Sequence, residues 1–484
     1  MLSPLTECWN IYEIELAGPR EGNPFVEVEL SAEFRYRNRC LLVDGFYDGD
    51  GIYRIRFMPD SEGEWTYSTR SNHPSLDGKT GQFTCTSAAL DNHGPVVAAD
   101  NCQFAYADGT RYTCFGTTCY AWNHQSEELQ EQTLRTLAAS PFNKLRMCVF
   151  PKNYSYNKNE PDCYPFVKQA DGAFDLRRFD PVFWQNLERR MGQLRDLKIE
   201  ADLILFHPYD EGRWGFDRMD AASDDFYLRY VVARLAAYRN VWWSLANEYD
   251  FMEKKQASDW DRFFHILQER DPYQRLRSIH NGARWYDHSK PWVTHASLQT
   301  TDLAGGIRFR EQYRKPVVYD ECCYEGNIEF LWGNITPELM TQNFWEGFLR
   351  GCYVGHGETY LHPEDILWWS KGGILHGSSP GCIAFLRSII EEAPAPLAPI
   401  TDLFGWEHRG ISVLGIPGQF YLLYFGMHQP GRKDIPLPSE GQFTIEVIDT
   451  WNQTITPLPG TYHGRCRVEL PGKPHIALRI KHVS

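Results

Sequence analysis

Hydrophobic and polar residues alternate with a period of two in the first part of the chain. Val26, Val28 and Leu30 alternate with glutamates, and the same period recurs over residues 53–57 and 65–67. Gly-Asp and Pro-Asp turn signals separate these short runs. Short alternating strands between frequent turns are typical of a β-sandwich, so we predict an N-terminal β-sandwich over residues 1–92.

From about residue 110 the pattern changes to short apolar runs separated by amphipathic segments with helical spacing. The runs predicted as strands are Thr113–Thr118, Lys144–Phe150, Ala201–Phe206, Val241–Ala246, Arg275–His280, Trp292–Ala296, Pro316–Tyr319 and Tyr353–Tyr360. Eight strands with intervening helices predict a (β/α)8 TIM barrel, which we assign to residues 93–392. A doubly wound sheet is the rival fold, and the lack of a glycine-rich loop after the first strand disfavours it.

The segment Ala393–Pro399 is rich in proline and alanine and predicts a linker. The β patterns that follow it are Phe420–Phe425, Phe443–Ile448 and Ile476–Ile480. They predict a C-terminal β-sandwich over residues 400–484. The expected fold class is therefore α/β, with a TIM barrel flanked by β-sandwich domains at both ends.

Composition narrows the range of partners. The chain has a formal net charge of −14 at pH 7, which argues against nucleic acid because phosphate binding needs a concentrated positive field. We find no apolar run long enough to span a membrane and no export signal, and the 13 cysteines have no regular spacing. We therefore expect a cytoplasmic protein without a membrane partner, and leave open a secreted form whose signal has been removed.

Two predicted barrel strands end in carboxylates. The fourth runs into Asn247 and Glu248, and the seventh runs into Asp320 and Glu321. Active sites of such barrels lie where the strands end. Side chains of a strand alternate between faces, so we do not expect Asp320 and Glu321 both to point into the barrel mouth, and parity does not choose between them. Paired carboxylates indicate glycosidic cleavage, in which one protonates the leaving oxygen and the other attacks or stabilises the anomeric carbon.

The segments "WWSLANE" and "KPVVYDECCYEG", three strands apart, resemble segments of clan A glycoside hydrolases. Together with "GFYDGDGIYRIRFMPDSEGEWTYST", they make the chain similar to cellulase-like and apiosidase-like barrels that carry an N-terminal sandwich. The resemblance implies a retaining glycoside hydrolase with Glu248 as general acid/base and Glu321 as nucleophile. Tyr249 stands where many cellulase-like enzymes have proline, which leaves the subgroup and the sugar open.

The resemblance also implies supporting residues. Asn247 would hydrogen-bond the sugar hydroxyl next to the anomeric carbon, and Arg146 would keep the nucleophile ionised by charge attraction. His207 and His280, at the ends of strands three and five, would bind sugar or tune the acid/base residue. The other substrate-binding candidates at strand ends and in loops are Tyr319, Trp214, Trp285, Glu358 and Trp368, with Trp332 and Trp369 as further aromatic candidates. Structural packing is the competing interpretation for the histidines and tryptophans.

The absence of metal-binding motifs argues against metal-dependent chemistry. The chain has no HExxH or His-x-His motif, so we expect no metal and no cofactor. Long loops after strands two, three and eight (residues 151–175, 208–225 and 361–382) predict a walled pocket and action on chain ends of a plant-derived oligosaccharide or glycoside. A transglycosylase using the same glutamates, or an inactive carbohydrate-binding or adhesin-like protein, are the alternatives. Bracing of the barrel is the default role of the sandwiches, and a homo-oligomer is left open.

Overall fold

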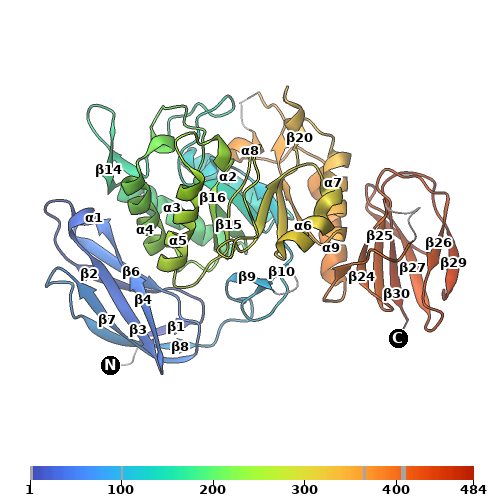
Figure 1. Cartoon of the computed structure of the whole chain (residues 1–484), viewed down its shortest axis with the longest axis horizontal. Helices are drawn as coiled ribbons and strands as arrows, with labels where there is room; N and C mark the ends of the chain where they lie inside the picture. The colour runs from blue at the N-terminus through green and yellow to red at the C-terminus, as the bar shows by residue number, and fades with distance from the viewer. Residues whose placement is uncertain (1–3, 100–101, 364–366, 405–409, 484) are drawn as a thin grey trace.

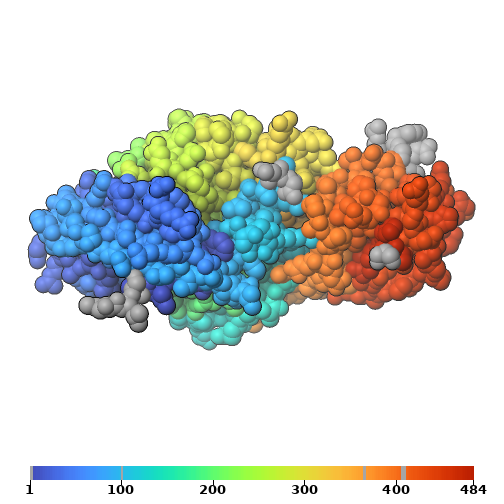
Figure 2. Space-filling model, turned by 90° about the horizontal axis from the view of Figure 1, so that it is seen from below, coloured from blue at the N-terminus to red at the C-terminus, as the bar shows by residue number. Residues whose placement is uncertain are grey.

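The computed structural model describes residues 4–99, 102–363, 367–404 and 410–483. An N-terminal β region, a central barrel and a C-terminal β region follow one another along the long axis of the molecule (Figures 1 and 2). Within the described ranges, no helix has the length and apolar character that crossing a membrane requires.

The N-terminal region consists of two sheets that share one hydrophobic core. The larger has the strand order β1-β8-β7-β3-β4 and the smaller the order β2-β6-β5. Their bounds are Leu5–Glu7 (β1), Tyr12–Ala17 (β2), Leu30–Tyr36 (β3), Arg39–Asp44 (β4), Phe46–Gly49 (β5), Ile52–Phe57 (β6), Gly63–Ser71 (β7) and Thr80–Thr86 (β8). The alternation around Val26 does not form a strand, because Pro24 begins a short helix, Pro24–Glu27 (α1), just before β3.

The central sheet is an eight-stranded parallel barrel with the order β17-β16-β15-β12-β11-β21-β19-β18. Its strands are Phe115–Thr118 (β11), Lys144–Cys148 (β12), Glu200–Phe206 (β15), Val241–Ala246 (β16), Arg277–Ser278 (β17), Ala296–Gln299 (β18), Val317–Glu321 (β19) and Tyr353–His356 (β21). A parallel bridge between His280 and Ser297 joins the two ends of this sheet, so the barrel is nearly closed.

Helices surround the barrel (Figure 1). They are Glu127–Ala138 (α2), Pro181–Asp196 (α3), Ala221–Leu235 (α4), Ala257–Arg270 (α5), Gly306–Tyr313 (α6), Pro337–Leu349 (α7), Trp368–Lys371 (α8) and Ser379–Glu392 (α9). Single 3-10 turns lie at Trp122–His124 (η1), Phe216–Arg218 (η2), Tyr249–Phe251 (η3), Leu303–Gly305 (η4) and Leu331–Gly333 (η5). Small strand pairs are formed by Val96–Ala99 (β9) with Gln103–Tyr106 (β10), Phe166–Lys168 (β13) with Phe174–Phe179 (β14), and Glu325–Gly326 (β20) with Glu358–Thr359 (β22).

Two predicted barrel strands differ from those observed. The sixth strand begins at Ala296, where the predicted one ends, because residues before it form a turn in which Val293 N–H donates to the Lys290 carbonyl. The eighth is divided into β21 and β22, and β22 pairs with β20 outside the barrel sheet. In both cases backbone hydrogen bonding in loops overrides the apolar pattern.

The C-terminal region contains a six-stranded sheet of order β23-β24-β25-β30-β27-β28 and a two-stranded sheet, β26-β29. The bounds are Ala398–Pro399 (β23), Ser412–Ile416 (β24), Phe420–Tyr424 (β25), Arg432–Pro436 (β26), Phe443–Asp449 (β27), Thr454–Pro457 (β28), Arg465–Glu469 (β29) and Ile476–His482 (β30). The expected linker is partly built into this sheet, because β23 pairs with β24 and Leu397 is buried.

Buried ion pairs join the N-terminal region to the barrel helices. Glu188 of α3 accepts hydrogen bonds from Arg56 of β6 at 2.5 Å and from Arg234 of α4 at 2.6 Å. Arg234 also donates to Asp48 of β5 at 2.7 Å. All four side chains are nearly inaccessible to solvent. Buried charges are stable only when they are paired, so these pairs fix how the two regions are joined.

Candidate active site

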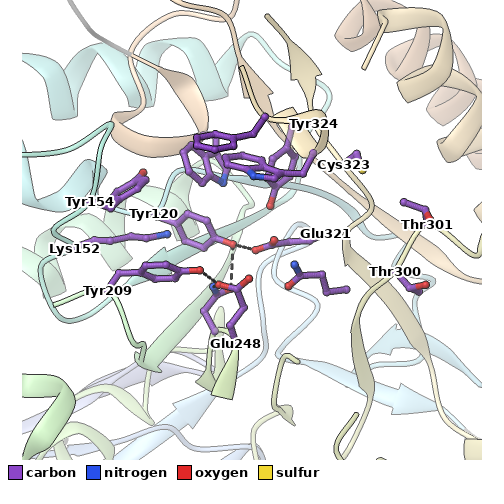
Figure 3. Close-up of a pocket in the computed structure, with 15 residues that line it drawn as sticks. Tyr120, Lys152, Tyr154, Tyr209, Glu248, Thr300, Thr301, Glu321, Cys323 and Tyr324 are labelled. Atoms are coloured by element: carbon purple, nitrogen blue, oxygen red, sulfur yellow. Dashed lines mark hydrogen bonds between the residues drawn. The ribbon is translucent and has the colours of Figure 1, made fainter. Parts of the chain in front are cut away.

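A cavity of about 580 Å³ lies at the carboxyl ends of the barrel strands. Its size is that of a small-ligand site. The lining residues are Tyr120, Lys152, Tyr154, Tyr209, Asn247, Glu248, Gln299, Thr300, Thr301, Glu321, Cys323, Tyr324, Phe330, Trp332 and Trp369 (Figure 3). The sequence-predicted pair, Glu248 and Glu321, therefore lies in one cavity, together with Asn247.

Glu248 follows directly after β16. Its backbone has φ of 48°, in the left-handed region that non-glycine residues rarely adopt. Asn247 Nδ2 donates to Glu248 Oε2 at 3.1 Å, and the hydroxyl of Tyr209 donates to the same oxygen. An unfavourable backbone conformation that persists at a pocket is often linked to function. Here it directs a buried carboxylate into the cavity.

Glu321 is the last residue of β19, and an irregularity in strand pairing sets its direction. Leu298 pairs with Tyr319, but the next residue of β18, Gln299, pairs with Glu321, so Asp320 is passed over. Asp320 faces the barrel interior and lies 2.6 Å from Lys144 Nζ, while Glu321 lines the cavity. As expected, the two carboxylates do not share the barrel mouth: only Glu321 lines the cavity, and the bulge sets the direction of its side chain.

A shared hydrogen-bond network connects the two glutamates. The hydroxyl of Tyr120 contacts Glu321 Oε1 and lies 3.0 Å from Asn247 Oδ1. Arg146, on β12, donates to Asn247 Oδ1 at 3.2 Å and has its Nη1 3.8 Å from Glu321 Oε1. A phenol has one proton to donate, so the Tyr120 hydroxyl donates either to Glu321 or to Asn247 at any one time. It can turn toward Glu321 when that carboxylate is charged.

The electrostatics of the pair favour one proton and one charge. Burial and then the charge of Glu248 raise the pKa of Glu321 to about 7, while Arg146, Tyr120 and Lys152 act to lower it. Burial opposes ionisation of Asp320 as well, but Lys144 and Arg146 hold its pKa well below its usual range. Asp320 is thus held as an anion below the pocket, whereas Glu321 can exchange its proton near neutral pH.

Two predicted histidines support the site from behind. His207 accepts the Tyr209 N–H at 3.2 Å and lies 3.1 Å from the Phe150 carbonyl, so it orients the loop that carries Tyr209. His280 Nδ1 lies 3.1 Å from Ser297 Oγ, and its Nε2 lies 3.7 Å from Glu321 Oε1. Neither histidine lines the cavity, and burial lowers the pKa of both, to about 3 for His207.

The other predicted binding residues also lie outside the cavity. Tyr319 faces away from the barrel interior and donates to the Asp302 carbonyl at 3.1 Å. Trp214 contacts Glu160 at 3.3 Å, and Trp285 packs on Phe309 with ring centroids 5.2 Å apart. Trp368 is buried with its indole donating to Thr117 at 2.9 Å, whereas its neighbour Trp369 lines the cavity. Trp214, Trp285 and Trp368 therefore do not line the cavity that contains the two glutamates.

Glu358 has a structural environment of its own. Its two carboxylate oxygens accept backbone N–H groups of His376 at 2.5 Å and Gly377 at 2.7 Å. Glu325 likewise accepts the amides of Ser378 at 2.8 Å and Ser379 at 3.2 Å. We call this pair of carboxylates with amides 376–379 the clasp. Burial raises the pKa of Glu358 to about 7. The clasp holds the loop after strand eight and does not line the cavity.

The sequence analysis missed Tyr120, Lys152 and Tyr209. Each follows closely after a barrel strand, namely β11, β12 and β15. Position at the carboxyl end of a strand was therefore the available signal, and it was not applied to these three residues. Tyr120 and Tyr209 each contact one of the two glutamates, so polar aromatic residues at strand ends carry the same information.

The fold and the site define a glycoside-hydrolase type of TIM barrel. Residues 99–373 match the family model of the apiosidase-like catalytic domain, and the chain belongs to this family. Residues 6–72 match a domain of unknown function, DUF5060, and residues 406–481 match another, DUF5605. No curated protein matches the chain.

Solved structures agree with this assignment. A Bacteroides vulgatus ATCC 8482 protein, classed provisionally as a glycoside hydrolase, is 42% identical over 99% of this chain and 100% of its own, with a TM-score of 0.94. A family 5 glycoside hydrolase from the same organism shares the fold at 13% identity, covering 80% of this chain and 93% of its own, with a TM-score of 0.62.

Proposed function

We propose that the protein is a retaining glycoside hydrolase with Glu321 as nucleophile and Glu248 as general acid/base. The observation that carries the proposal is the convergence of two buried glutamates, from the ends of β16 and β19, on one cavity. Arg146 and Tyr120 surround Glu321 with a positive charge and a hydrogen-bond donor. Such surroundings suit a carboxylate that must attack as an anion.

In the first step, a Glu321 oxygen would bond to the anomeric carbon while the bond to the leaving oxygen breaks. Glu248 would give its proton to that oxygen, and a glycosyl ester on Glu321 would remain. In the second step, Glu248 would take a proton from water as this water attacks the anomeric carbon, which releases Glu321. Asn247, which donates to Glu248, would contact the sugar hydroxyl next to the anomeric carbon.

The walls of the cavity support action at chain ends. Each of the three long loops after strands two, three and eight contributes a lining residue: Tyr154, Tyr209 and Trp369. Tyr324, Phe330 and Trp332 add an aromatic wall, and apolar sugar faces pack well on such rings. We therefore propose an exo-acting enzyme on a plant-derived oligosaccharide or glycoside.

A panel of aryl glycosides and plant oligosaccharides tests the activity. Turnover with retained anomeric configuration, lost in Glu321→Gln, supports the proposal, and inverted product contradicts the double displacement. Binding without turnover would instead favour a carbohydrate-binding protein, and transfer of the glycosyl group to sugars without hydrolysis would favour a transglycosylase. On an oligosaccharide of defined length, early release of only mono- or disaccharide supports exo action, whereas random fragments contradict it.

A further inference from the structure

Lys152 places a positive charge among aromatic rings in the wall of the cavity. Its Nζ lies 3.8 Å from the ring centroid of Tyr120, 4.2 Å from that of Tyr209, 4.5 Å from that of Tyr154 and 5.1 Å from that of Trp369. The residue is 2% exposed. Within the described part of the chain, no carboxylate forms an ion pair with this ammonium group. Figure 3 shows Lys152 between Tyr154 and Tyr209, with its ammonium group pointing toward Tyr120.

This arrangement is unfavourable without a compensating role. Burial lowers the pKa of Lys152, because an ammonium group without a paired anion loses its hydration. Attraction between the ammonium group and the negative faces of the surrounding rings offsets part of the lost hydration free energy. A methionine would fill the same space without the loss, so packing alone does not explain a lysine here.

Two of the four rings belong to the tyrosines that contact the glutamates. Tyr120 donates to Glu321, and Tyr209 donates to Glu248. A cation over the face of a phenol stabilises negative charge on its oxygen, which makes the hydroxyl a stronger donor. The same charge attracts both carboxylates directly, across the cavity that all three side chains line.

We propose that Lys152 is a positioning residue, which fixes the rings of Tyr120 and Tyr209 against the catalytic pair and favours the charged form of Glu321. The inference rests on the proposed function and adds a third charged group to the site. It differs from the role of Arg146, which approaches Glu321 and Asn247 directly, because Lys152 acts through two aromatic rings.

Other charged and titratable groups that act on this part of the site must be considered together with Lys152. Those acting on Glu321 are Glu248, Arg146, His280, Tyr120, Tyr324 and Cys323, and those acting on Lys152 are Cys148, His207, Arg146 and the two glutamates. Arg146 remains in any Lys152 variant and keeps part of the attraction. We therefore expect a shift in the ionisation of Glu321 and not its loss.

The first test is the pH profile of kcat/KM for Lys152→Met. We expect kcat to fall and the acidic limb to move to higher pH by about half to one unit, since a nearby positive charge has been removed. Lys152→Arg should leave that limb close to its wild-type position. Lys158→Met is the matched control, because Lys158 is an exposed lysine of the same loop. An unmoved limb in correctly folded Lys152→Met would overturn the proposal.

The second test needs no turnover. The pKa of Glu321 is raised from 4.5 to about 7 in the folded protein. Protonation of Glu321 therefore contributes its full stabilisation below pH 4.5, and this contribution is lost as the pH rises to about 7. The thermal midpoint of Glu321→Gln should therefore exceed that of wild type by an amount that grows over this pH range and is constant above it. When both proteins also carry Lys152→Met, the difference between their midpoints should level off at a higher pH. Levelling at the same pH in both backgrounds refutes the role of Lys152, even if no glycoside is ever cleaved.

Discussion

Tyr209 and Asn247 donate hydrogen bonds to the same oxygen of Glu248, Oε2. An oxygen that accepts two donors is kept unprotonated, so in the proposed mechanism Glu248 would carry its proton on Oε1. The two donors would thus choose which oxygen of Glu248 faces the leaving group.

Tyr209→Phe removes one of these donors while keeping the ring. We expect kcat/KM to fall by about 10- to 100-fold on substrates with poor leaving groups, in line with a lost hydrogen bond to a charged group. Good leaving groups should suffer less, since they need little protonation. Steady-state kinetics on a series of aryl glycosides measures the difference. Tyr164→Phe, outside the cavity, is the control, and an equal loss on all substrates would argue that Tyr209 only shapes the pocket.

Glu248→Ala should separate leaving groups even more strongly. We expect rates on poor leaving groups to fall by about 10²- to 10⁴-fold, whereas activated aryl glycosides should keep a fast first step and accumulate the glycosyl-enzyme. Intact-protein mass spectrometry detects this species, and azide should speed its release by replacing the missing base. A loss that is the same for every leaving group contradicts the assignment of Glu248 as the acid.

The pH dependence of turnover follows from the ionisation of Glu321. Its pKa is about 7, raised by burial and by Glu248, and the nucleophile acts only as an anion. If Glu321 is the nucleophile, as proposed, we expect kcat/KM to rise with pH through about 7 as Glu321 loses its proton. The profile should be recorded with a neutral substrate between pH 4 and 10. Activity that is already maximal near pH 5 would contradict a nucleophile with this pKa.

The N-terminal region should contribute to the stability of the barrel through Glu188. Glu188→Ala leaves Arg56 and Arg234 buried without their shared partner, and breaking buried pairs of this kind costs about 3–5 kcal/mol. We expect a clearly lower thermal midpoint. Asp60→Asn, which disrupts the exposed pair with Arg39, is the matched control and should change stability by less than about 1 kcal/mol. Equal effects would argue against a bracing role for this interface.

Residues near strand ends were the most predictable part of the site. Glu248, Glu321 and Asn247 were found from the sequence because a buried strand fixes where its last residues lie. Arg146, in the middle of β12, was proposed only from the resemblance to clan A glycoside hydrolases. Even at the strand ends, the register shift between β18 and β19 could not be foreseen, since it depends on pairing between strands. In loops, the sequence does not predict which side chains reach the cavity. Trp368 is buried against Thr117, whereas its neighbour Trp369 lines the cavity. Only the tertiary packing of the loop distinguishes them.

The clasp anchors one end of a loop that lines the cavity. Glu325 and Glu358 belong to β20 and β22 and accept hydrogen bonds from four successive amides at the start of α9. At the other end of the loop, Trp368 donates to Thr117 on β11. Trp369, which lines the cavity, is therefore held between two fixed points. In protein engineering, Trp369 is the position where a side chain of another size could change the accepted sugar while the backbone of the loop stays in place.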